Sequence, residues 1–288
     1  MKKIYIFGVG LIGGSIALKT RDLNIYDEII GIGRVGGNSL NSLVKSGVLN
    51  ASSTEIGKEI NDASLIVIAT PVAQTKLILK EIQPFLNSNS IVTDVGSTKS
   101  DIMNEAKLIL NDKFSQFIGS HPIAGSEKHG PSAAKKDLFK DKNIVLTPNK
   151  ENSIEKISEL KTFWELLGGK VTNMNADDHD QIFSTVSHLP HLLAYGLVSL
   201  INNKENKDVL LNFAASGFRD FSRIAASSPE VWKDIAIQNH KSIIKDLKLF
   251  QKEIIKLTTF IEKKDAEKLE DYLKLASSTR KNWVEEIK

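Results

Sequence analysis

The sequence predicts a doubly wound α/β domain with a parallel sheet, followed by an all-α helical domain. Residues 2–174 alternate short β-branched runs with helical stretches, which is typical of parallel βαβ units. A glycine-rich turn follows the first of these runs. After residue 174 there is no further convincing strand, and long helical stretches are interrupted only by short polar turns. We therefore expect two domains, 1–174 and 175–288.

Seven strands are expected in the first domain, and helical periodicity fills the intervals between them. The strands are predicted at residues 2–8, 28–33, 64–70, 89–95, 116–120, 143–148 and 170–174. Between two of them, in residues 74–86, apolar side chains recur at helical spacing; these are Leu77, Ile78, Ile82, Phe85 and Leu86. Such a helix packs one face on a sheet, and we expect helices on both faces of this sheet.

The last part of the second domain, residues 229–288, includes a stretch that is apolar on more than one face. A helix of this kind packs against two partners. It is either an interior helix of the domain or a helix packed between subunits, and the sequence leaves both open.

Composition excludes several classes of function. The net charge is +3, with 38 Lys and Arg against 35 Asp and Glu, which is too small and dispersed for a nucleic-acid or anionic-membrane footprint. The chain has no cysteine, so disulfides, thiolate metal sites and a cysteine nucleophile are excluded. The longest apolar runs are far shorter than the roughly 20 residues of a membrane span. A cytoplasmic enzyme or binding protein is expected.

The glycine turn has the pattern G-x-G-x-x-G, with Gly8, Gly10 and Gly13 directly after a strand and at the start of a helix. The first glycine permits the tight turn, the second lets the backbone approach a pyrophosphate, and the third allows close packing of helix on strand. Backbone N–H groups at the helix N-terminus then hold the phosphates. This predicts a Rossmann-type dinucleotide-binding domain.

The end of the second strand decides between the two nicotinamide cofactors. An acidic residue there binds the ribose hydroxyls of NAD, but this chain has Gly33 followed by Arg34. A guanidinium at Arg34 suits the 2′-phosphate of NADP. The sequence therefore favours NADP over NAD, unless Arg34 is only an exposed loop residue.

Polar residues also follow two later strands, at the edge where a doubly wound sheet binds its ligands. Residues 94–99 include Ser97, which serves either as a helix N-cap or as a site residue. Residues 119–127 place His121 and Glu127 in one short loop, and a positioned imidazole is a candidate general base.

Two segments of the helical domain add further candidates. His188 and His191 are three residues apart, on one face of a helix. They offer no clear third ligand, so no metal site is expected. Arg219 and Arg223 are four residues apart and form either a salt-bridged surface or a clamp for a substrate carboxylate.

Taken together, these segments resemble the prephenate and arogenate dehydrogenase family of tyrosine biosynthesis. The resemblance extends along essentially the whole chain. Its motifs are GVGLIGGS at 8–15, ATP at 69–71, DVGSTK at 94–99, GSHPIAGSE at 119–127, SHLPH at 187–191 and GFRDFSRIAASSPEVWKDI at 217–235. The resemblance implies a dinucleotide-binding domain followed by a helical domain that forms a homodimer.

The family reaction is the oxidative decarboxylation of a cyclohexadienyl acid, prephenate or arogenate, with hydride transfer to NAD or NADP. The resemblance implies that His121 accepts the proton of the ring hydroxyl and that Ser97 holds that imidazole or the hydroxyl in place. It implies that Arg223 binds a substrate carboxylate and that His188 and His191 line the substrate side of the cleft.

The resemblance gives further residues less definite roles. Ser126 and Glu127 belong to the substrate side, where Glu127 either pairs with a cation and gates the cleft or accepts the ammonium of arogenate. Trp232 packs near the site or only fills the core. The cofactor residues implied in addition to the three glycines and Arg34 are Leu11, Ile12, Thr70, Pro71 and Gly96.

Two other functions remain as alternatives. Another two-domain reductase, of the imine or β-hydroxyacid type, would usually rely on a lysine in the helical domain. A non-catalytic nucleotide sensor would use the same fold to bind a partner. The substitution His121→Asn separates the latter from an enzyme, since an enzyme loses turnover while keeping its cofactor.

Overall fold

The computed structural model describes residues 2–33, 38–125 and 130–287 of the 288-residue chain. It divides into two compact units, Met1–His240 and Lys241–Lys288. In the first unit, strands and helices alternate up to residue 173. The elements of that stretch are β1 (Lys3–Phe7), α1 (Leu11–Leu23), β2 (Glu28–Ile32), α2 (Asn38–Lys45), β3 (Ala51–Ser53), β4 (Leu65–Ile68), α3 (Thr75–Ile82), β5 (Ile91–Asp94), α4 (Ser100–Leu110), β6 (Gly119–Pro122), β7 (Asn143–Thr147), α5 (Ile154–Leu166) and β8 (Lys170–Asn173).

Helices make up the rest of the chain, and no strand follows β8 among the residues described. They are α6 (Ala176–Phe183), α7 (Leu189–Asn202), α8 (Lys207–Asn212), α9 (Ser216–Ser222), α10 (Pro229–Gln238), α11 (His240–Glu262) and α12 (Ala266–Ile287). A π-helical turn, Ser184–His188, connects α6 to α7. The predicted division into an α/β part and a helical part is confirmed, whereas the exact boundary between residues 174 and 175 remains a prediction.

Five parallel strands form the first sheet, in the order β3-β2-β1-β4-β5. The chain starts in the middle at β1, adds β2 and β3 on one side, and then crosses to β4 and β5 on the other. This reversal is the doubly wound arrangement, and it places a ligand crevice at the carboxyl ends of β1 and β4. The sequence did not predict β3, which is only three residues long and has no buried side chain.

The three remaining strands form a second sheet, in the order β6-β7-β8, and here the expectation of parallel pairing was partly wrong. β7 and β8 are parallel, but β6 runs antiparallel to β7. The residues just before β6 continue the first sheet, since Ile118 donates its N–H to the carbonyl of Val92 in β5 at 2.9 Å. The two sheets are therefore joined at β5.

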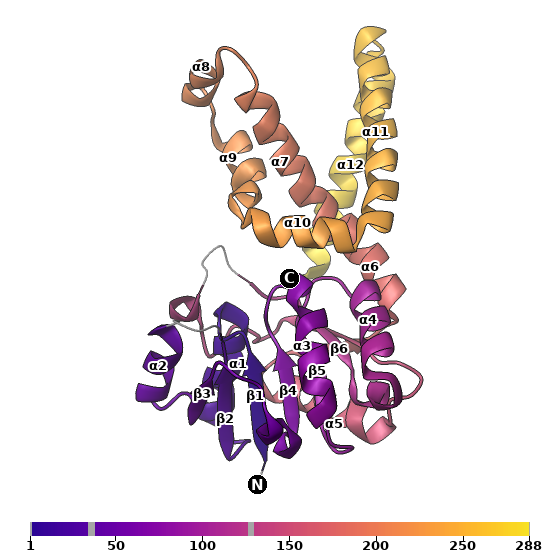
Figure 1. Ribbon diagram of the computed structural model, residues 1–288. Helices are drawn as coiled ribbons and strands as arrows, with labels where there is room; N and C mark the ends of the chain where they lie inside the picture. The colour runs from indigo at the N-terminus through magenta and orange to yellow at the C-terminus, as the bar shows by residue number, and fades with distance from the viewer. Residues whose placement is uncertain (1, 34–37, 126–129, 288) are drawn as a thin grey trace. The chain divides into compact units, whose positions relative to one another are not determined.

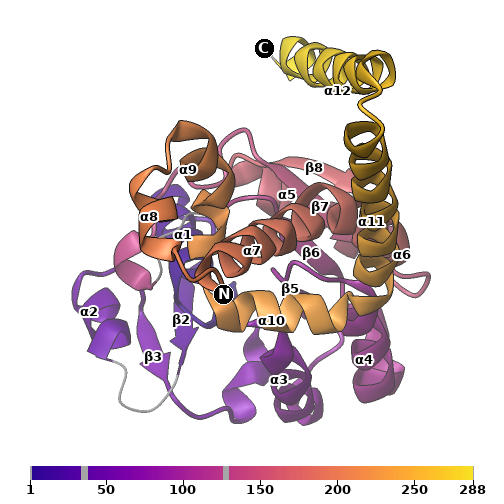
Figure 2. The same ribbon diagram turned by 90° about the horizontal axis from the view of Figure 1, so that it is seen from above.

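Helices cover both faces of the first sheet, as the sequence predicts (Figures 1 and 2). Alternate residues of each strand point to opposite faces. Ile4 and Ile6 of β1 pack in one core with the buried residues of α1 and α5. Tyr5 and Phe7 pack in the other core with the buried residues of α3 and α4.

The helix predicted over residues 74–86 is shorter than expected. α3 ends at Ile82, and Gln83–Phe85 form a 3-10 turn that contains Pro84. Pro84 has no backbone N–H to donate to the carbonyl four residues earlier, which accounts for this end. Ile78, Leu79 and Ile82 are buried, whereas Leu77 is 59% exposed and does not belong to the buried face.

The second unit contains most of α11 and all of α12, joined through Lys264, whose φ of 52° is left-handed. Ile243 is buried, but many other apolar side chains of α11 are exposed within a single chain. They include Ile244, Leu247, Leu249, Ile254, Ile255 and Ile261. In the described part of the chain, no helix has the length and apolar character needed to cross a membrane.

Candidate active site at the carboxyl ends of the strands

The glycine turn connects β1 directly to α1. Gly8 has a φ of 83°, and its N–H donates to the carbonyl of Ile32 in β2 at 2.9 Å. A Cβ on Gly13 would lie 2.2 Å from the carbonyl oxygen of Gly8, whereas a Cβ on Gly10 would meet no atom within 4 Å. Gly8 and Gly13 therefore hold the turn against the strand, and Gly10 leaves open space beside it.

The N-terminus of α1 is available to bind an anion. Gly10 is its N-cap residue and provides no side-chain hydrogen bond, and the first turn contains no acidic residue. The N–H groups of a first helical turn have no partner within the helix and carry a partial positive charge. Together with the space beside Gly10, this geometry suits a pyrophosphate.

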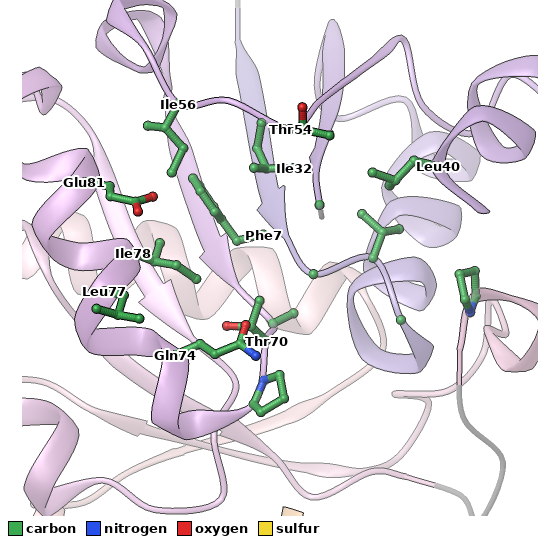
Figure 3. Close-up of a pocket in the computed structure, with 17 residues that line it drawn as sticks. Phe7, Ile32, Leu40, Thr54, Ile56, Thr70, Gln74, Leu77, Ile78 and Glu81 are labelled. Carbon is green, nitrogen blue, oxygen red and sulfur yellow. The ribbon is translucent and has the colours of Figure 1, made fainter. Parts of the chain in front are cut away.

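A cavity of about 700 Å³ opens beside this turn, between the ends of β1, β2 and β4 (Figure 3). Its lining is mostly apolar, and Leu77, exposed on α3, is part of it. The described lining residues are Phe7, Gly8, Val9, Gly10, Ile32, Gly33, Leu40, Thr54, Ile56, Ala69, Thr70, Pro71, Gln74, Leu77, Ile78, Glu81 and Pro131. The size and apolar walls fit the adenosine half of a dinucleotide.

Two polar features of this cavity bear on the cofactor. The buried hydroxyl oxygen of Thr70 has no hydrogen-bond partner among the described residues, so a ligand in the cavity would satisfy it. Glu81 on α3 is the one carboxylate in the described lining, and none comes from β2. Arg34, which the sequence singled out for cofactor choice, lies outside the described residues.

Only some of the other predicted cofactor residues line the first cavity. Gly8, Gly10, Thr70 and Pro71 line this first cavity, and Ile12 lines a second one. The remaining three line neither cavity; they are Leu11, Gly13 and Gly96. Gly96 instead donates its N–H to the carboxylate of Asp94 at 2.8 Å, so that it shapes the turn after β5.

The second cavity, of about 590 Å³, gathers polar residues from the strand ends and from the helices that follow residue 175. Six residues predicted for catalysis or substrate binding line it: Ser97, His121, His188, His191, Arg223 and Trp232. Ile12 of α1 also lines it, whereas Gly10, two residues earlier, lines the first cavity. The N-terminus of α1 therefore borders both cavities.

His121 lies in β6 and is 9% exposed. Burial lowers its pKa well below the usual 6.5, and the nearby His179, Lys99 and His188 lower it further. Its Nδ1 is 2.8 Å from Nε2 of His179 on α6. The imidazole is therefore neutral at physiological pH, and Nε2 is the ring nitrogen that remains for a ligand in the cavity.

Two carboxylates, which the sequence did not single out, support this region. Asp180 accepts hydrogen bonds from the backbone N–H groups of Lys99 at 2.8 Å and Ser100 at 2.9 Å, so it tethers α6 to the start of α4. Asp94, at the end of β5, pairs with the ammonium of Lys99, and both side chains are buried. Burial lowers the pKa of Lys99 although Asp94 opposes that shift.

His188 and His191 both lie against Trp232. The rings of His191 and Trp232 are stacked with centroids 3.8 Å apart, and the ring of His188 meets Trp232 edge-on at 6.1 Å. Nδ1 of His191 donates to the carbonyl of Ser187 at 2.9 Å, and burial lowers the pKa of His188 to about 4. Trp232 thus lines the cavity wall together with both histidines.

Arg223 is the one arginine or lysine in the described lining of this cavity. It begins a 3-10 turn, Arg223–Ala226, and its charge lies close enough to His191 to lower the pKa of that imidazole, an effect secondary to burial. Arg219 does not line the cavity, so the two arginines do not form a joint clamp there. The predicted residues Ser126 and Glu127 lie outside the described residues. No group of three or more metal-ligating side chains is found in the ranges that the structure describes.

Sequence reasoning missed His179, Asp180 and Asn239. Asn239 donates its side-chain N–H to the carbonyl of Asp180 at 2.7 Å and contacts Nδ1 of His188 at 3.1 Å. The run Asp177-Asp178-His179-Asp180 is the sequence signal that points to two of these residues. His179 and Asp180 are buried on α6, and buried polar side chains need hydrogen-bond partners. Those partners are distant in sequence, which is why the run alone does not identify them.

Two family models match the chain in succession. Residues 16–173 match the nucleotide-binding domain of prephenate dehydrogenase, and residues 175–275 match the dimerization domain of prephenate dehydrogenase.

Individual proteins resemble the chain over nearly its whole length. A prephenate dehydrogenase of Bacillus subtilis is 37% identical over 279 residues, covering 96% of this chain and 75% of that protein. The crystal structure of Aquifex aeolicus prephenate dehydrogenase in complex with hydroxyphenyl propionate and NAD+ superimposes with a TM-score of 0.91 at 32% identity, covering 98% of both chains. The crystal structure of Synechocystis arogenate dehydrogenase gives a TM-score of 0.83 at 29% identity, covering 98% of this chain and 99% of that one.

Proposed function

The chain belongs to the prephenate dehydrogenase family of NAD-dependent oxidoreductases in tyrosine biosynthesis, and on that premise we propose that its second cavity binds prephenate or arogenate and that His121 is the catalytic base. One observation supports this most directly. The second cavity combines a buried neutral imidazole, a guanidinium and the start of α1, which belongs to the dinucleotide-binding turn. These are the parts that an alcohol oxidation on an anionic substrate requires.

The substrate is held through its charge. Arg223 binds a carboxylate of the cyclohexadienyl acid with two parallel N–H donors, a geometry that suits a carboxylate better than a lysine ammonium does. His188, His191 and Trp232 form the wall beside it. A ring system of this size fits the cavity, and the stacked histidine and tryptophan give it a flat surface.

Proton transfer takes place at Nε2 of His121. The hydroxyl on the ring carbinol carbon donates its proton to this nitrogen while the C–H bond of the same carbon breaks. A neutral imidazole within hydrogen-bond reach contributes about 10² to 10⁴ in rate. Ser97 lines the same cavity and orients the hydroxyl or the imidazole.

The bound nicotinamide supplies the hydride acceptor. The electrons of the bond to the ring carboxylate move into the ring as that carboxylate leaves as carbon dioxide, so that the ring becomes aromatic. The products are 4-hydroxyphenylpyruvate from prephenate and tyrosine from arogenate. Aromatisation makes the overall step effectively irreversible. No ring carbon has to be protonated, and the proton that His121 took from the hydroxyl returns to the phenolate oxygen of the product.

For the cofactor, we propose a preference for NADP over NAD. The support is the absence of a carboxylate from β2 in the described lining of the first cavity, together with Arg34 two positions after the end of that strand. The Aquifex aeolicus relative was crystallised with NAD+, so the two cofactors must be compared directly on this chain.

We further propose that the protein acts as a homodimer in the cytoplasm. The support for the dimer is the match to a dimerization domain and the exposed apolar side chains of the helical region, among them Leu200, Leu211 and Phe213. Large exposed apolar patches mark protein–protein contacts.

The test is turnover by the purified full-length protein in four mixtures, prephenate or arogenate with NAD or NADP, followed by the absorbance of the reduced nicotinamide. The account predicts turnover in at least one mixture and a higher kcat/KM with NADP than with NAD. No turnover in any mixture, in a protein that still binds the cofactor, would overturn the proposed reaction. A preference for NAD would overturn only the role given to Arg34.

A further inference from the structure

The side chains of His121, His179 and Asp180 are hydrogen-bonded in series, starting at the second cavity. Nδ1 of His121 lies 2.8 Å from Nε2 of His179, and Nδ1 of His179 lies 2.8 Å from Oδ1 of Asp180. His179 is fully buried and Asp180 is 3% exposed. His179 does not line the cavity, so it acts on a ligand there only through His121.

The direction of each hydrogen bond follows from the end of the chain. Burial would raise the pKa of Asp180, but hydrogen bonds from His179 and from the backbone of Ser100 and Lys99 outweigh it and lower that pKa. Asp180 is therefore ionised at neutral pH and can only accept hydrogen bonds. Nδ1 of His179 must therefore carry the ring proton and donate a hydrogen bond to Asp180.

The hydrogen bond between His179 and His121 then has only one possible direction. Burial lowers the pKa of His179, and Lys99 lowers it further, although Asp180 and Asp94 oppose the shift. A neutral His179 with its proton on Nδ1 has a lone pair on Nε2, so Nδ1 of His121 must be the donor in the bond between the two rings. The titratable groups that face His121 from other elements are His179, Lys99 and His188, and each of them disfavours an imidazolium there.

Packing and hydrogen bonds also fix the orientation of the imidazole rings of His121 and His179. Phe183, one turn after His179 on α6, packs its ring 4.5 Å from that of His179 and 4.9 Å from that of His121. Asp180 is itself held by two backbone N–H groups at the start of α4. Neither imidazole can rotate without breaking one of these hydrogen bonds.

We propose that His179 and Asp180 are positioning residues that fix the tautomer of His121, so that Nδ1 carries the ring proton and Nε2 accepts the proton of the substrate hydroxyl. This inference rests on the proposed role of His121 as the base. Hydrogen-bonded partners of this kind commonly fix which nitrogen of an active histidine is basic, and their loss costs about 10- to 100-fold in activity or affinity in metal sites, where the effect is best measured.

The tautomer can be observed without any turnover. In the full-length protein labelled with ¹⁵N-histidine, the two ring nitrogens of each of the six histidines are distinguished by their ¹⁵N shifts and their couplings to the ring protons. At neutral pH the inference predicts that His121 is protonated on Nδ1 and not on Nε2, and that His179→Leu removes this preference. His121 protonated on Nε2 in the unsubstituted protein would overturn the inference whatever the protein catalyses.

Kinetics of two substitutions at one position then separate positioning from packing. His179→Leu removes the acceptor, whereas His179→Gln keeps an amide oxygen that accepts from Nδ1 of His121 but cannot be protonated. We expect His179→Leu to lose about 100-fold in kcat with little change in the KM of substrate or cofactor, and His179→Gln to stay within about fivefold of the parent. The matched control is His240→Gln, at an exposed histidine whose Nδ1 donates to the carbonyl of Ile237, and its kcat should be unchanged.

Equal losses in the two His179 variants, or a His179→Leu enzyme with full kcat, would overturn the inference while leaving the proposed reaction standing. Should His179→Leu fail to fold in a thermal-unfolding measurement, the inference is tested by the tautomer of His121 in the parent protein and by the kcat of His179→Gln. A protein that shows the predicted tautomer but no turnover would overturn the proposed reaction and not the positioning of the ring.

Discussion

His121 is buried among groups that oppose its protonation, and this determines how its activity should depend on pH. Its pKa lies well below 6.5 because of burial, with further lowering by His179, Lys99 and His188. A base must be unprotonated to act, so activity rises as pH increases through the pKa of the free enzyme. The lowered value moves this rise to lower pH.

We therefore predict that kcat/KM reaches its plateau already below pH 6.5 and falls only under more acidic conditions. A pH profile of kcat/KM, measured between pH 4.5 and 9 with a substrate concentration well below KM, checks this. An acidic limb with its midpoint at or above 6.5 would show that His121 is not the titrating base or is not buried as described.

The proposed binding of the substrate carboxylate by Arg223 can be tested separately from the role of His121. Arg223→Lys keeps the charge but loses the planar pair of donors, and Arg223→Gln loses both. We predict that the KM of the substrate rises about tenfold in the lysine variant and about 100-fold in the glutamine variant, since a hydrogen bond to a charged group contributes about 1.5–3 kcal/mol. Cofactor KM should not change, because Arg223 does not line the first cavity. A selective rise in cofactor KM would contradict the assignment.

Sequence reasoning found several of the residues that line the second cavity but missed those that support them. Residues such as His121 and Arg223 stand in short polar motifs at the ends of predicted elements. His179 and Asp180 act only through partners about 60 to 80 positions away, in β6 and at the start of α4. Such a pairing becomes visible only once the fold brings α6 over the strand ends.

Among the elements, those with strong periodicity were predicted well and those set by tertiary contacts were not. The strands near the centre of the sheet, such as β1 and β4, are continuous apolar runs and match their predicted positions closely. β3 is too short to carry a pattern, and the antiparallel direction of β6 depends on pairing with β7. The π-helical turn before α7 inserts a residue into the helical hydrogen-bond pattern, and it has no distinct sequence signature.

The glycine turn gives a prediction about a single element with a built-in control. Gly10→Ala adds a methyl group where no protein atom lies within 4 Å, whereas Gly13→Ala forces a Cβ to within 2.2 Å of the carbonyl of Gly8. We predict that Gly10→Ala leaves Tm nearly unchanged and raises the cofactor KM at least tenfold, because the methyl group occupies the space of the pyrophosphate. Gly13→Ala should lower Tm by several degrees.

Thermal unfolding and cofactor titration of both variants check this. If Gly10→Ala binds the cofactor as tightly as the parent protein, the pyrophosphate does not lie beside the glycine turn. If Gly13→Ala is as stable as the parent, the turn is not packed as tightly as the structure indicates.

For the whole molecule, the question is how the exposed apolar helical surface is covered. The helices after residue 175 leave large side chains exposed in a single chain, among them Phe213, which is 84% exposed. We predict a dimer at micromolar concentration, and light scattering coupled to size exclusion should give a mass twice the 31.8 kDa of one chain. A mass of one chain under these conditions would contradict the proposed homodimer.

The central claim is that His121 removes the hydroxyl proton in the second cavity, and the substitution His121→Asn tests it most directly. Asparagine keeps a polar side chain of similar reach but provides no basic nitrogen. The account predicts that kcat falls by about 10² to 10⁴ while the dissociation constants of cofactor and substrate stay within a few fold. A variant that turns over at nearly the parent rate, or one that loses cofactor binding instead of turnover, would contradict the account.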